Sequence, residues 1–473
     1  MSSPLSVDQI RAKIGHPILD ADGHMLEFLP AVRDHVIALG GSDMAEPFDT
    51  IYYQMRAVQN LPAETKRAFG AFRMSWWAFP ARNTLDRATA HLPRLMYSRL
   101  EEMGLDYAVI YPTHGLTAMM MPDSEVRTVF CRAFNQYYAE EFSEFSDRMT
   151  PAAVIPMDTP EEGVAELEYA INTLKLKTAV VGGYAFRPLE GENLPRIARW
   201  VDTLGIDSPY DYDPVWQRCL DLGISPTFHS SGMGWPNRAS VSSYAYNHIG
   251  SFAAASEATC RSLVMGGVPQ RFPNLKMAFL EGGVSWATNL YSDMIGHWEK
   301  RSRDLAHYDP TAIDRDRLLK LFEEYGSPRA KQHLDQLDAI DVLSDPNEPR
   351  DNLDEFSATG FGSAEDIKKV FTENFYFGCE ADDPMNATAF NTRANPLGAK
   401  FKPIFSSDIG HWDVPEMNGV VQEAWELVDD GLLTEADFKE FVFSNNANML
   451  LSGNPNFFQG TAVEDEVKKA LKP

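Results

Sequence analysis

Short, continuous apolar runs recur along the chain and alternate with longer stretches in which apolar residues repeat at helical spacing. An apolar run without polar alternation is typical of a parallel strand that is buried on both faces. We therefore predict eight such strands, at residues 16–22, 106–112, 149–157, 178–186, 224–230, 275–283, 374–380 and 402–408. Amphipathic helices are expected between most of them, for example over 160–175, where Pro160 followed by two glutamates favours a helix start, and over 250–267.

Eight strands that alternate with helices predict a (β/α)8 barrel of the TIM type, and a doubly wound open sheet is the alternative. The length of 473 residues suits a single barrel domain over residues 1–473 that carries insertions. Two long segments interrupt the alternation, residues 25–100 between the first two strands and residues 300–365 between the sixth and seventh.

The two insertions differ in composition. The first holds a cluster of aromatic residues, namely Tyr52, Tyr53, Phe69, Phe72, Trp76, Trp77 and Phe79. The second is highly charged and contains the segment SDPNEPRDNLDE at 344–355. We interpret the first as a lid or pocket wall and the second as a helical excursion on the surface. The alternative is that both insertions only serve an oligomer interface.

Composition and charge exclude several classes of protein. Hydrophobic residues make up 44% of the chain and charged residues 23%, which is ordinary for a packed protein and unlike a disordered chain, a fibre or a coiled coil. With 42 Lys and Arg against 68 Asp and Glu, the net charge of −26 disfavours nucleic acid and anionic membranes as partners. A signal-peptide pattern, an apolar run of about 18 residues and CxxC spacing are all missing. We expect a cytoplasmic protein with reduced cysteines.

Residues with metal-binding side chains follow four of the predicted strands. Asp22 and His24 come at the end of the first strand, His229 at the end of the fifth, Glu281 at the end of the sixth and Asp408 at the end of the eighth. In such barrels the catalytic groups lie at the carboxyl ends of the strands, so these side chains should converge. Ionised carboxylates inside an apolar barrel need a cation. The set predicts one or two divalent ions of zinc, manganese or iron.

Further acid–base and supporting residues are expected at the barrel mouth. His248, in YNHIG, is a candidate acid–base group or additional ligand, although a structural role at a helix start is equally compatible with its position. Glu257 and Glu380 are candidates for orienting a ligand or facing the mouth, and the alternative for Glu380 is a loop charge. His411 and Asp413 fit a loop-fixing or supporting role better than that of ligands.

Candidate substrate-binding residues are an arginine pair and several aromatic residues. Arg82 and Arg87, in PARNTLDRAT, can clamp a substrate carboxylate, unless they pair at the surface with Asp86 or Asp123. An aromatic substrate wall would be formed by Tyr184, Trp235, Trp76 and Trp77. The alternative is that these aromatic residues belong to the core.

The order of these motifs, DxH, then His, then Asp after the last strand, resembles the amidohydrolase superfamily. In particular it resembles the branch that includes aminocarboxymuconate-semialdehyde decarboxylase and the resorcylate-type decarboxylases. The segments MGGVPQRFPNLKMAFLEGG (265–283) and FSSDIGHWDVP (405–415) carry the resemblance, which runs through nearly all eight strands. It implies a (β/α)8 barrel, a divalent metal with ligands at Asp22, His24, His229 and Asp408, and a homodimer.

The sequence departs from that branch in three places. The branch often begins with HxH or ExH, whereas this chain has Asp22, which preserves metal binding. The sixth strand of those decarboxylases usually ends in a histidine that donates or accepts a proton, and the matching residue here is Glu281. Glu281 can carry out acid–base work if its pKa is raised, or it can bind metal. No lysine follows the fourth strand, so a two-metal site would need Glu281, Asp408 or another carboxylate as its bridge.

Three classes of function follow from these residues. The leading hypothesis is a metal-dependent hydrolase or decarboxylase that acts on a fairly large apolar or aromatic acid or ester, with Asp408 and Glu281 exchanging protons. The alternative is a nonheme dinuclear iron oxygenase, a monooxygenase or hydroxylase, in which Glu281 is an extra metal ligand. A barrel that binds a small molecule without catalysis, through a degenerate site, is the third class.

Overall fold

The computed structural model describes residues 5–53, 57–58, 60–73, 82–189, 191, 199–230, 234–236, 240–302, 305–343, 347 and 349–470. This part of the chain holds one sheet of eight parallel strands and a separate antiparallel hairpin. The strands of the large sheet are β1 (Leu19–Met25), β2 (Tyr107–Pro112), β3 (Met149–Ile155), β4 (Thr178–Val181), β7 (Thr227–Phe228), β8 (Met277–Phe279), β9 (Phe375–Cys379) and β10 (Pro403–Phe405). The hairpin pairs β5 (Ala185–Pro188) with β6 (Arg199–Asp202).

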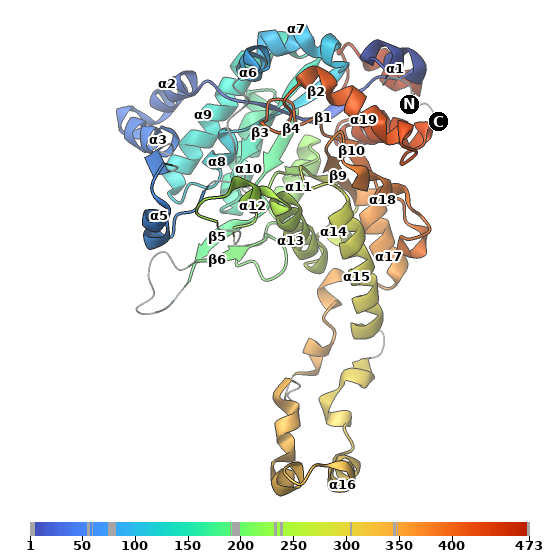
Figure 1. The fold of residues 1–473 in the computed structure, drawn as a ribbon. Coiled ribbons are helices and arrows are strands. Elements are labelled where there is room, and N and C mark those ends of the chain that lie inside the picture. The colour runs from blue at the N-terminus through green and yellow to red at the C-terminus, as the bar shows by residue number, and fades with distance from the viewer. Residues whose placement is uncertain are drawn as a thin grey trace.

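The large sheet is a barrel rather than an open sheet. Its strands lie side by side in chain order, without the reversal of order that a doubly wound sheet has. Its first and last strands meet where Asp408 N–H donates to Asp22 O at 3.0 Å and His24 N–H donates to Ile409 O at 2.7 Å. Helices surround the strands (Figure 1). The predicted (β/α)8 barrel is therefore confirmed, including its two insertions.

The apolar runs form strands because they are covered on both faces. Every residue of the eight barrel strands is buried, whereas β5 and β6 are partly exposed. Between the strands and the surrounding helices, aromatic rings pack together: Phe228 stacks on Phe279 with ring centroids 5.1 Å apart, and Phe228 also contacts Trp216 of α11 (Asp213–Leu222) at 6.2 Å. Burial on both faces explains why these strands lack the polar alternation of a half-exposed sheet.

Helices follow most of the barrel strands and cover the barrel. Those in the first half of the chain are α1 (Val7–Ile14), α2 (Leu29–Gly40), α3 (Ala45–Tyr52), α5 (Ala63–Phe69), α6 (Thr84–His91), α7 (Pro93–Met103), α8 (Gly115–Ala118), α9 (Ser124–Phe142), α10 (Pro160–Glu168) and α11 (Asp213–Leu222). Those in the second half are α12 (Tyr244–His248), α13 (Ser251–Met265), α14 (Val268–Arg271), α15 (Ser285–Arg301), α16 (Arg315–Tyr325), α17 (Ala364–Lys369), α18 (Ala387–Phe390), α19 (Val420–Asp429), α20 (Glu435–Lys439), α21 (Asn445–Gly453) and α22 (Glu464–Ala470). Among the described residues, no helix has both the length and the apolar character needed to cross a membrane.

Local sequence accounts for the helix starts that were expected. Thr159 caps α10 by accepting a hydrogen bond from Glu162 N–H at 3.3 Å, and Pro160 occupies the first helical position. The predicted helix over 160–175 continues past α10 as a π-helical segment, Tyr169–Thr173. The helix predicted over 250–267 is α13.

The fourth predicted strand, 178–186, is divided in two. β4 ends at Val181, and the chain then leaves the barrel and enters the β5–β6 hairpin. Thr259, on α13, donates from its hydroxyl to Gly183 O at 2.7 Å and so holds the chain at the point of division. The apolar run therefore covers two strands of different sheets.

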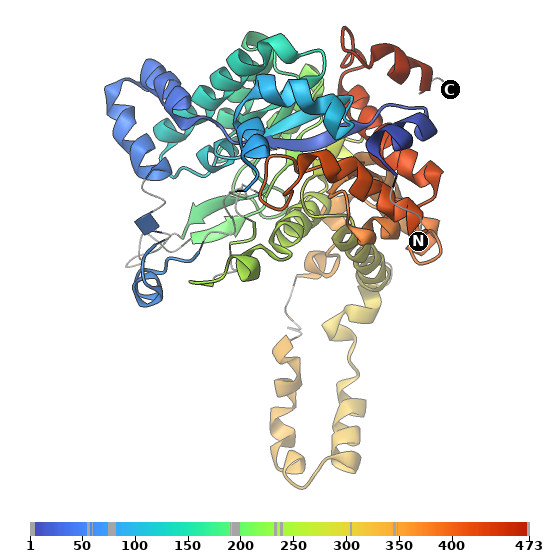
Figure 2. The same ribbon diagram turned by 45° about the horizontal axis from the view of Figure 1, so that its top comes forward.

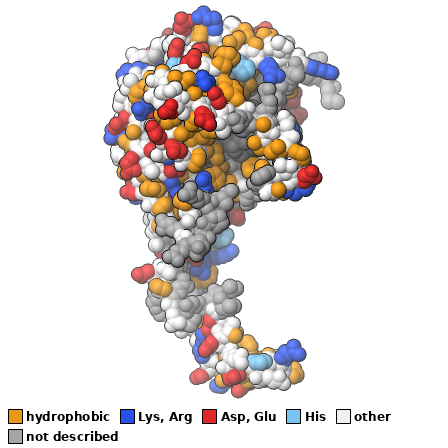
Figure 3. Space-filling model, turned by 90° about the vertical axis from the view of Figure 1, so that its left-hand side faces the viewer, with side chains coloured by type: hydrophobic (Ala, Val, Ile, Leu, Met, Phe, Trp, Pro, Cys, Tyr) orange, Lys and Arg blue, Asp and Glu red, His pale blue; other side chains and the backbone are white. Residues whose placement is uncertain are grey.

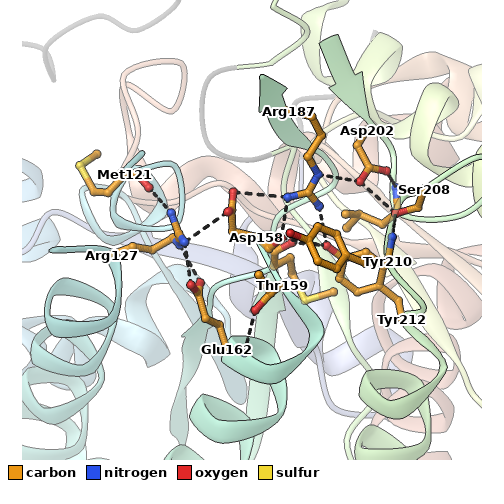
Figure 4. A network of polar contacts seen from close by, with 12 residues as sticks. Met121, Arg127, Asp158, Thr159, Glu162, Arg187, Asp202, Ser208, Tyr210 and Tyr212 are labelled. Atoms are coloured by element: carbon orange, nitrogen blue, oxygen red, sulfur yellow. Dashed lines mark hydrogen bonds and ion pairs between the residues drawn. The ribbon is translucent and has the colours of Figure 1, made fainter. Parts of the chain in front are cut away.

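A buried network of ion pairs fixes this hairpin to the rim of the barrel (Figure 4). Arg187 of β5 donates to Asp202 of β6 at 2.9 Å and to the Tyr212 hydroxyl at 2.7 Å. Asp158, which follows β3, lies 3.6 Å from Arg187 and 3.3 Å from Arg127 of α9. The network joins the hairpin to the segment after β3 and to α9, at the end of the barrel where the strands terminate.

The first insertion packs against the barrel helices. α2 contacts α9, and Tyr52 of α3 is buried against Phe48, Phe130 and Phe134 with ring centroids 4.7 to 6.2 Å apart. Tyr52 therefore belongs to the core rather than to an open pocket wall. Trp76, Trp77 and Phe79 lie outside the described residues, as does the side chain of Phe69, so their predicted place in a lid stays a prediction.

The second insertion is a helical arm that projects from the barrel (Figures 1 and 2). It leaves after α15 and carries α16 at its far end, and a 3-10 helical segment, Ala330–Leu343, returns beside α16. Pro310 is the one buried residue among the described side chains of 305–341. In the space-filling view the arm is a narrow extension below a rounded body (Figure 3). The predicted helical excursion is confirmed, and it extends well beyond the barrel surface.

Candidate metal centre

The first strand supplies two of the predicted ligands. Asp22 and His24 lie within β1, near its carboxyl end, and both are buried. Gly23 between them is required by space, because a Cβ at this position would lie 2.9 Å from Asp20 Oδ2 and 3.1 Å from Ile409 Cγ1. The middle residue of the DxH motif is thus glycine for a steric reason, whereas the aspartate and the histidine supply the chemistry.

The imidazoles of His24 and His229 turn their Nε2 atoms toward each other and toward the carboxylates. His24 Nδ1 contacts Pro112 O at 3.2 Å, which leaves Nε2 free to face the site. His24 Nε2 lies 3.3 Å from Asp22 Oδ1, 3.5 Å from Asp408 Oδ1 and 3.2 Å from His229 Nε2. Glu281 belongs to the same cluster, because its Oε2 lies 2.9 Å from His229 Nε2. The ends of four strands therefore bring ligand atoms together.

Two of the carboxylates are held on an unusual backbone. Glu281 has φ 57° and Asp408 has φ 54°, and Ser230, next to His229, has φ 45°. Such left-handed conformations are rare for residues other than glycine, and they cluster at functional sites because the surrounding structure must impose them. Each of these residues lies two or three positions after the end of a barrel strand, where the backbone turns out of the strand.

The segment after β10 adds a third imidazole. His411 Nδ1 lies 2.7 Å from Asp408 Oδ1, and its Nε2 lies 2.9 Å from the Thr113 hydroxyl. Its ring stacks on that of His24, with centroids 3.7 Å apart. Gly410 allows this approach, because it has φ 97° and a Cβ there would lie 2.2 Å from His24 O. His411 therefore lies inside the cluster, closer than the loop-fixing position expected for it.

Burial sets the protonation of the cluster. It raises the pKa of Asp22, Glu281 and Asp408 well above their usual range, and neighbouring carboxylates raise the pKa of each further. Burial and then the neighbouring His229 imidazole lower the pKa of His24 well below its usual range. The neutral imidazole is the form that binds metal, whereas the buried carboxyl groups must release their protons when a cation binds.

An acidic cavity of about 340 Å³ opens beside the cluster. Its lining includes His248, Glu281, Glu380, Asp413 and Trp412. Burial raises the pKa of Glu380 to about 8 and lowers that of His248. The His248 ring packs edge-on against Trp412, with centroids 5.2 Å apart. His248 and Glu380 thus line the cavity beside the ligand cluster, and the acid–base role of His248 stays a prediction.

The other predicted site residues lie elsewhere. Tyr184 is buried, donates from its hydroxyl to Gly234 O at 2.6 Å and packs edge-on against Trp235, with ring centroids 5.7 Å apart. It lines a second cavity, of about 210 Å³, together with Met119, Met121 and Phe186.

Arg82 is exposed, Glu257 pairs with Arg261 at 3.0 Å, and Trp76 and Trp77 fall outside the described residues. Their substrate-binding or orienting roles stay predictions.

The residues fit a divalent metal ion. Ligand atoms of Asp22, His24 and His229 all lie within 4.8 Å of one another, and the same is true of His24, Glu281 and His411, and of Asp408, His411 and Asp413. Asp408 Oδ2 is buried and accepts no hydrogen bond from a donor among the described residues. Mixed carboxylate and imidazole donors are the set that zinc, manganese and iron accept.

Two supporting residues, Asp20 and Glu27, were not predicted from the sequence. Asp20 accepts hydrogen bonds from Ser407 N–H at 3.0 Å and from the Ser407 hydroxyl at 2.5 Å, and so joins β1 to the segment after β10. Glu27 is buried and accepts from the backbone N–H groups of Thr113, His114 and Gly115 and from the Tyr138 hydroxyl. By fixing Thr113, Glu27 also positions His411. The only signal in the sequence was the density of acids in HPILDADGHMLE.

Comparison with known proteins finds a family model and a curated relative that match part of this chain. The model of the amidohydrolase family matches residues 120–330. A curated relative, 2-amino-3-carboxymuconate-6-semialdehyde decarboxylase of Dictyostelium discoideum, is 29% identical over 152 residues, which cover 32% of this chain and 37% of that protein. The match thus spans little more than a third of the relative's length.

Two solved structures align with most of this chain. An amidohydrolase from Mycobacterium avium subsp. paratuberculosis K-10 has a TM-score of 0.52 at 15% identity, over 92% of this chain and 99% of its own. A dihydroxybenzoic acid decarboxylase from Polaromonas sp. JS666, solved with bound manganese, has a TM-score of 0.49 at 15% identity, over 92% and 97%. The chain thus has a (β/α)8 barrel fold, and its residues 120–330 match the model of the amidohydrolase family, which its sequence motifs resemble.

Proposed function

We propose that this protein is a metal-dependent enzyme, a decarboxylase or hydrolase whose substrate is an apolar or aromatic acid or ester. The observation that carries the proposal is the convergence of Asp22, His24, His229 and Asp408, with His24 Nε2 within 3.5 Å of a ligand atom of each of the others. The family match and the decarboxylase activity named for the curated relative support the same class of reaction.

A metal ion bound by these residues would hold a substrate oxygen or activate a water molecule. The protein's own side chains would supply the proton that the reaction needs. In a decarboxylation, the bond from carbon to the carboxylate breaks, carbon dioxide leaves, and the electron pair that stays on the carbon takes up a proton. Glu281 is the candidate donor, because its carboxyl group lies both in the cluster and on the cavity wall and its pKa is raised by burial.

His248 is the candidate for exchanging that proton with solvent. It lies on the wall of the same cavity as Glu281, and its pKa is lowered by burial. Phe252 and Trp412 contribute the apolar part of the wall, against which an aromatic ring can pack.

Removal and return of metal test this proposal. The purified protein is treated with a chelator, and carbon dioxide release and ester hydrolysis are measured over a panel of aromatic carboxylic acids and their esters, with and without added Mn²⁺ or Zn²⁺. We expect activity only in the metal-loaded protein and a loss of at least about 100-fold in Asp22→Asn, because a ligand is removed. Activity that survives both treatments would refute a metal-dependent reaction.

A dinuclear iron oxygenase is the second candidate, and Glu281 is the observation in its favour. Glu281 replaces the histidine of the decarboxylase branch and adds an anionic ligand to the cluster. Oxygen consumption by the iron-loaded protein separates the two functions. Substrate-dependent oxygen uptake without carbon dioxide release supports the oxygenase, and the opposite result supports the decarboxylase.

A further inference from the structure

The second cavity lies at the mouth of the barrel, between the segments that follow β2, β3 and β4. Its lining includes four methionines, Met119, Met120, Met121 and Met157. In the barrel these three strands lie between β1, which carries Asp22 and His24, and β7, which precedes His229. This methionine cavity is therefore next to the ligand cluster, and the acidic cavity, whose lining follows β7, β8, β9 and β10, lies on the other side of the cluster.

Two walls of the methionine cavity continue into segments that touch the ligand cluster. The segment after β2 contacts the cluster through the Thr113 hydroxyl, which is 2.9 Å from His411 Nε2, before it reaches the cavity. The segment after β4 also lines the cavity, and a Cβ at Gly183 would lie 3.8 Å from the Cα of Ser230, next to His229. A molecule bound at the ligand cluster therefore lies within a few residues of the cavity wall on both sides.

The lining of the methionine cavity suits an aromatic ring. Tyr184 and Phe186 add their own rings to it, and the Tyr184 hydroxyl is already bonded to Gly234 O. Methionine side chains adapt to the shape of a bound group, and their sulfur atoms make favourable contacts with aromatic rings. An apolar cavity of about 150 Å³ holds benzene, so a cavity of about 210 Å³ has room for one ring with a small substituent.

The charged groups of the lining do not oppose an apolar ligand. Asp158 and Arg199 are the charged residues among its described members. Asp158 lies 3.3 Å from Arg127 and 3.6 Å from Arg187, and Arg199 is exposed, so ion pairs compensate the first charge and water solvates the second. A bound ring is not forced to cover an unpaired charge.

The walls of the cavity are held in place without a ligand (Figure 4). Arg127 of α9 donates to Met121 O, which fixes the backbone at Met121. On the hairpin, Arg187 follows Phe186 in β5, and its hydrogen bond to Asp202 fixes that wall. A preformed cavity binds a ligand at a smaller cost in ordering than a mobile one.

We propose that the methionine cavity binds an aromatic ring at the end of the substrate that is remote from the reacting group. The substrate is then an aryl-substituted acid or ester. Its carboxyl group lies at the ligand cluster, and a second apolar group of the size of one ring fills the cavity. Met121 and Met157 select this group, because both are buried in the lining and come from different strand ends. The inference rests on the proposed function and narrows its substrate class.

Calorimetric titration of the full-length protein loaded with Zn²⁺ tests the inference. The probes are ω-phenylalkanoic acids from phenylacetate to phenylhexanoate, and each is compared with the straight-chain acid that lacks the phenyl group. We expect the phenyl group to raise the affinity at least about 10-fold once the chain is long enough for the ring to reach the cavity, because an apolar ring then leaves water. Removal of the metal should abolish the binding of both series.

The two series separate the inference from the proposed function. Metal-dependent binding of both series, with equal affinity at every chain length, would overturn the inference and leave the proposed function intact. A phenyl gain that persisted in metal-free protein would overturn it too, since the carboxylate would not be held at the cluster. Absence of any binding would also overturn the inference, and carbon dioxide release and ester hydrolysis would still decide the proposed function.

Met121→Gln and Met157→Gln place a polar amide in the cavity wall at nearly constant volume. Each should reduce the gain from the phenyl group at least about 5-fold and leave Zn²⁺ binding unchanged, because burial of the ring then desolvates an amide. Met265→Gln, at a half-buried methionine at the end of α13 that lines neither cavity, is the matched control and should keep the full gain. An undiminished gain in both cavity variants would refute the assignment to these methionines.

A measurement on the wild-type protein does not depend on how the glutamine variants fold. Methionine methyl groups are labelled with ¹³C, and the phenyl acid that binds most tightly is added to the Zn²⁺-loaded protein. Ring currents should shift the methyl resonances of Met121 and Met157 and leave that of Met265 unchanged. The resonances are assigned through Met121→Leu and Met157→Leu, because packed sites tolerate such volume-conserving changes. Shifts confined to other methionines would place the ring elsewhere and overturn the inference.

Discussion

Glu281 and Asp408 show how much of this site is decided by single residues. Both have left-handed backbone conformations, and each costs roughly 1–3 kcal/mol relative to a relaxed strand end. The surrounding contacts that impose them include the hydrogen bond from Asp408 N–H to Asp22 O. A residue that keeps such a conformation in place of glycine is retained for its side chain, which supports a ligand role for both carboxylates.

Lys402 gives a residue-scale prediction about pH. It precedes β10, and its ammonium donates to Glu373 O at 3.2 Å and lies 4.8 Å from the Tyr376 ring centroid. Burial, and then the nearby Lys276, lowers the pKa of Lys402 to about 8, below the usual value of about 10.4. Between these two values the unfolded chain binds more protons than the folded protein, so this group makes the free energy of unfolding rise with pH.

Lys402→Met removes that buried charge and keeps the alkyl chain. We expect the variant to be more stable than the wild type at pH 7, by roughly 1–2 kcal/mol after allowance for screening by solvent, and the advantage to shrink as the pH rises above 8. Urea unfolding at pH 7, 8 and 9.5 measures this. Lys469→Met, at an exposed lysine of α22, should show no such trend, and a gain that stayed constant with pH would contradict the assignment to Lys402.

At the scale of elements, the sequence predicted the barrel strands well and the hairpin poorly. A strand buried on both faces is visible as an apolar run, and β1, β2 and β3 lie where such runs do. The run TAVVGGYAF does not show that its second half joins another sheet, because that depends on a hydrogen bond from Thr259, far along the chain.

The candidate site, too, could be predicted from the sequence only in part. Asp22, His24, His229, Glu281 and Asp408 could be found from their places at strand ends, since barrel topology alone brings strand ends together. The positions of His411 and Asp413 depend on the turn at Gly410. The hydrogen bonds that Glu27 accepts depend on the loop after β2. Those contacts are tertiary, and a sequence pattern carries no sign of them.

The hairpin gives the element-scale prediction. Asp202 is fully buried and accepts hydrogen bonds from Arg187, from the Ser208 hydroxyl at 2.9 Å and from Leu204 N–H at 2.9 Å. Asp202→Ala leaves the buried Arg187 guanidinium without its partner on β6. We expect the free energy of unfolding to fall by about 3–5 kcal/mol in urea denaturation, because the buried Arg187 charge loses its nearer acidic partner and keeps the more distant Asp158, 3.6 Å away.

A control on α11 separates this effect from simple loss of an acid. Asp221 is exposed and pairs with Gln217, so Asp221→Ala should change the free energy of unfolding by no more than about 0.5 kcal/mol. The double variant Arg187→Met with Asp202→Ala should recover part of the lost stability, since it removes both charges. If Asp202→Ala is no less stable than Asp221→Ala, the network does not hold the hairpin.

At the scale of the whole molecule, the two insertions have opposite relations to the barrel. α2 and α3 bury Val32, Val36 and Phe48 completely, whereas the described part of the arm buries almost nothing against the body. The arm is also continuous with α15, so it is held at its base and exposed along its length (Figure 1). The homodimer expected from the sequence stays a prediction, and the arm is the segment whose removal tests it with least damage to the barrel.

The arm can be removed because its two ends meet. Arg301, at the end of α15, pairs with Glu355 at 2.7 Å, so a short Gly–Ser linker can replace residues 303–352. We expect this variant to fold, to bind the same number of Mn²⁺ ions as the full chain and to melt within about 4 °C of it, the shift that 1 kcal/mol produces in a mid-sized domain. Calorimetry and equilibrium dialysis measure these, and light scattering gives the mass of both proteins.

Deletion of residues 29–52 is the contrasting control. It removes α2 and α3, uncovers the face of α9 on which α2 packs and takes away three completely buried side chains, each of which contributes roughly 1.5–3 kcal/mol through burial. This deletion should abolish cooperative unfolding, whereas removal of the arm should not. If loss of the arm also abolished it, the arm would be part of the folding core, and its exposure along residues 305–341 would have to be covered in solution by a second copy of the chain.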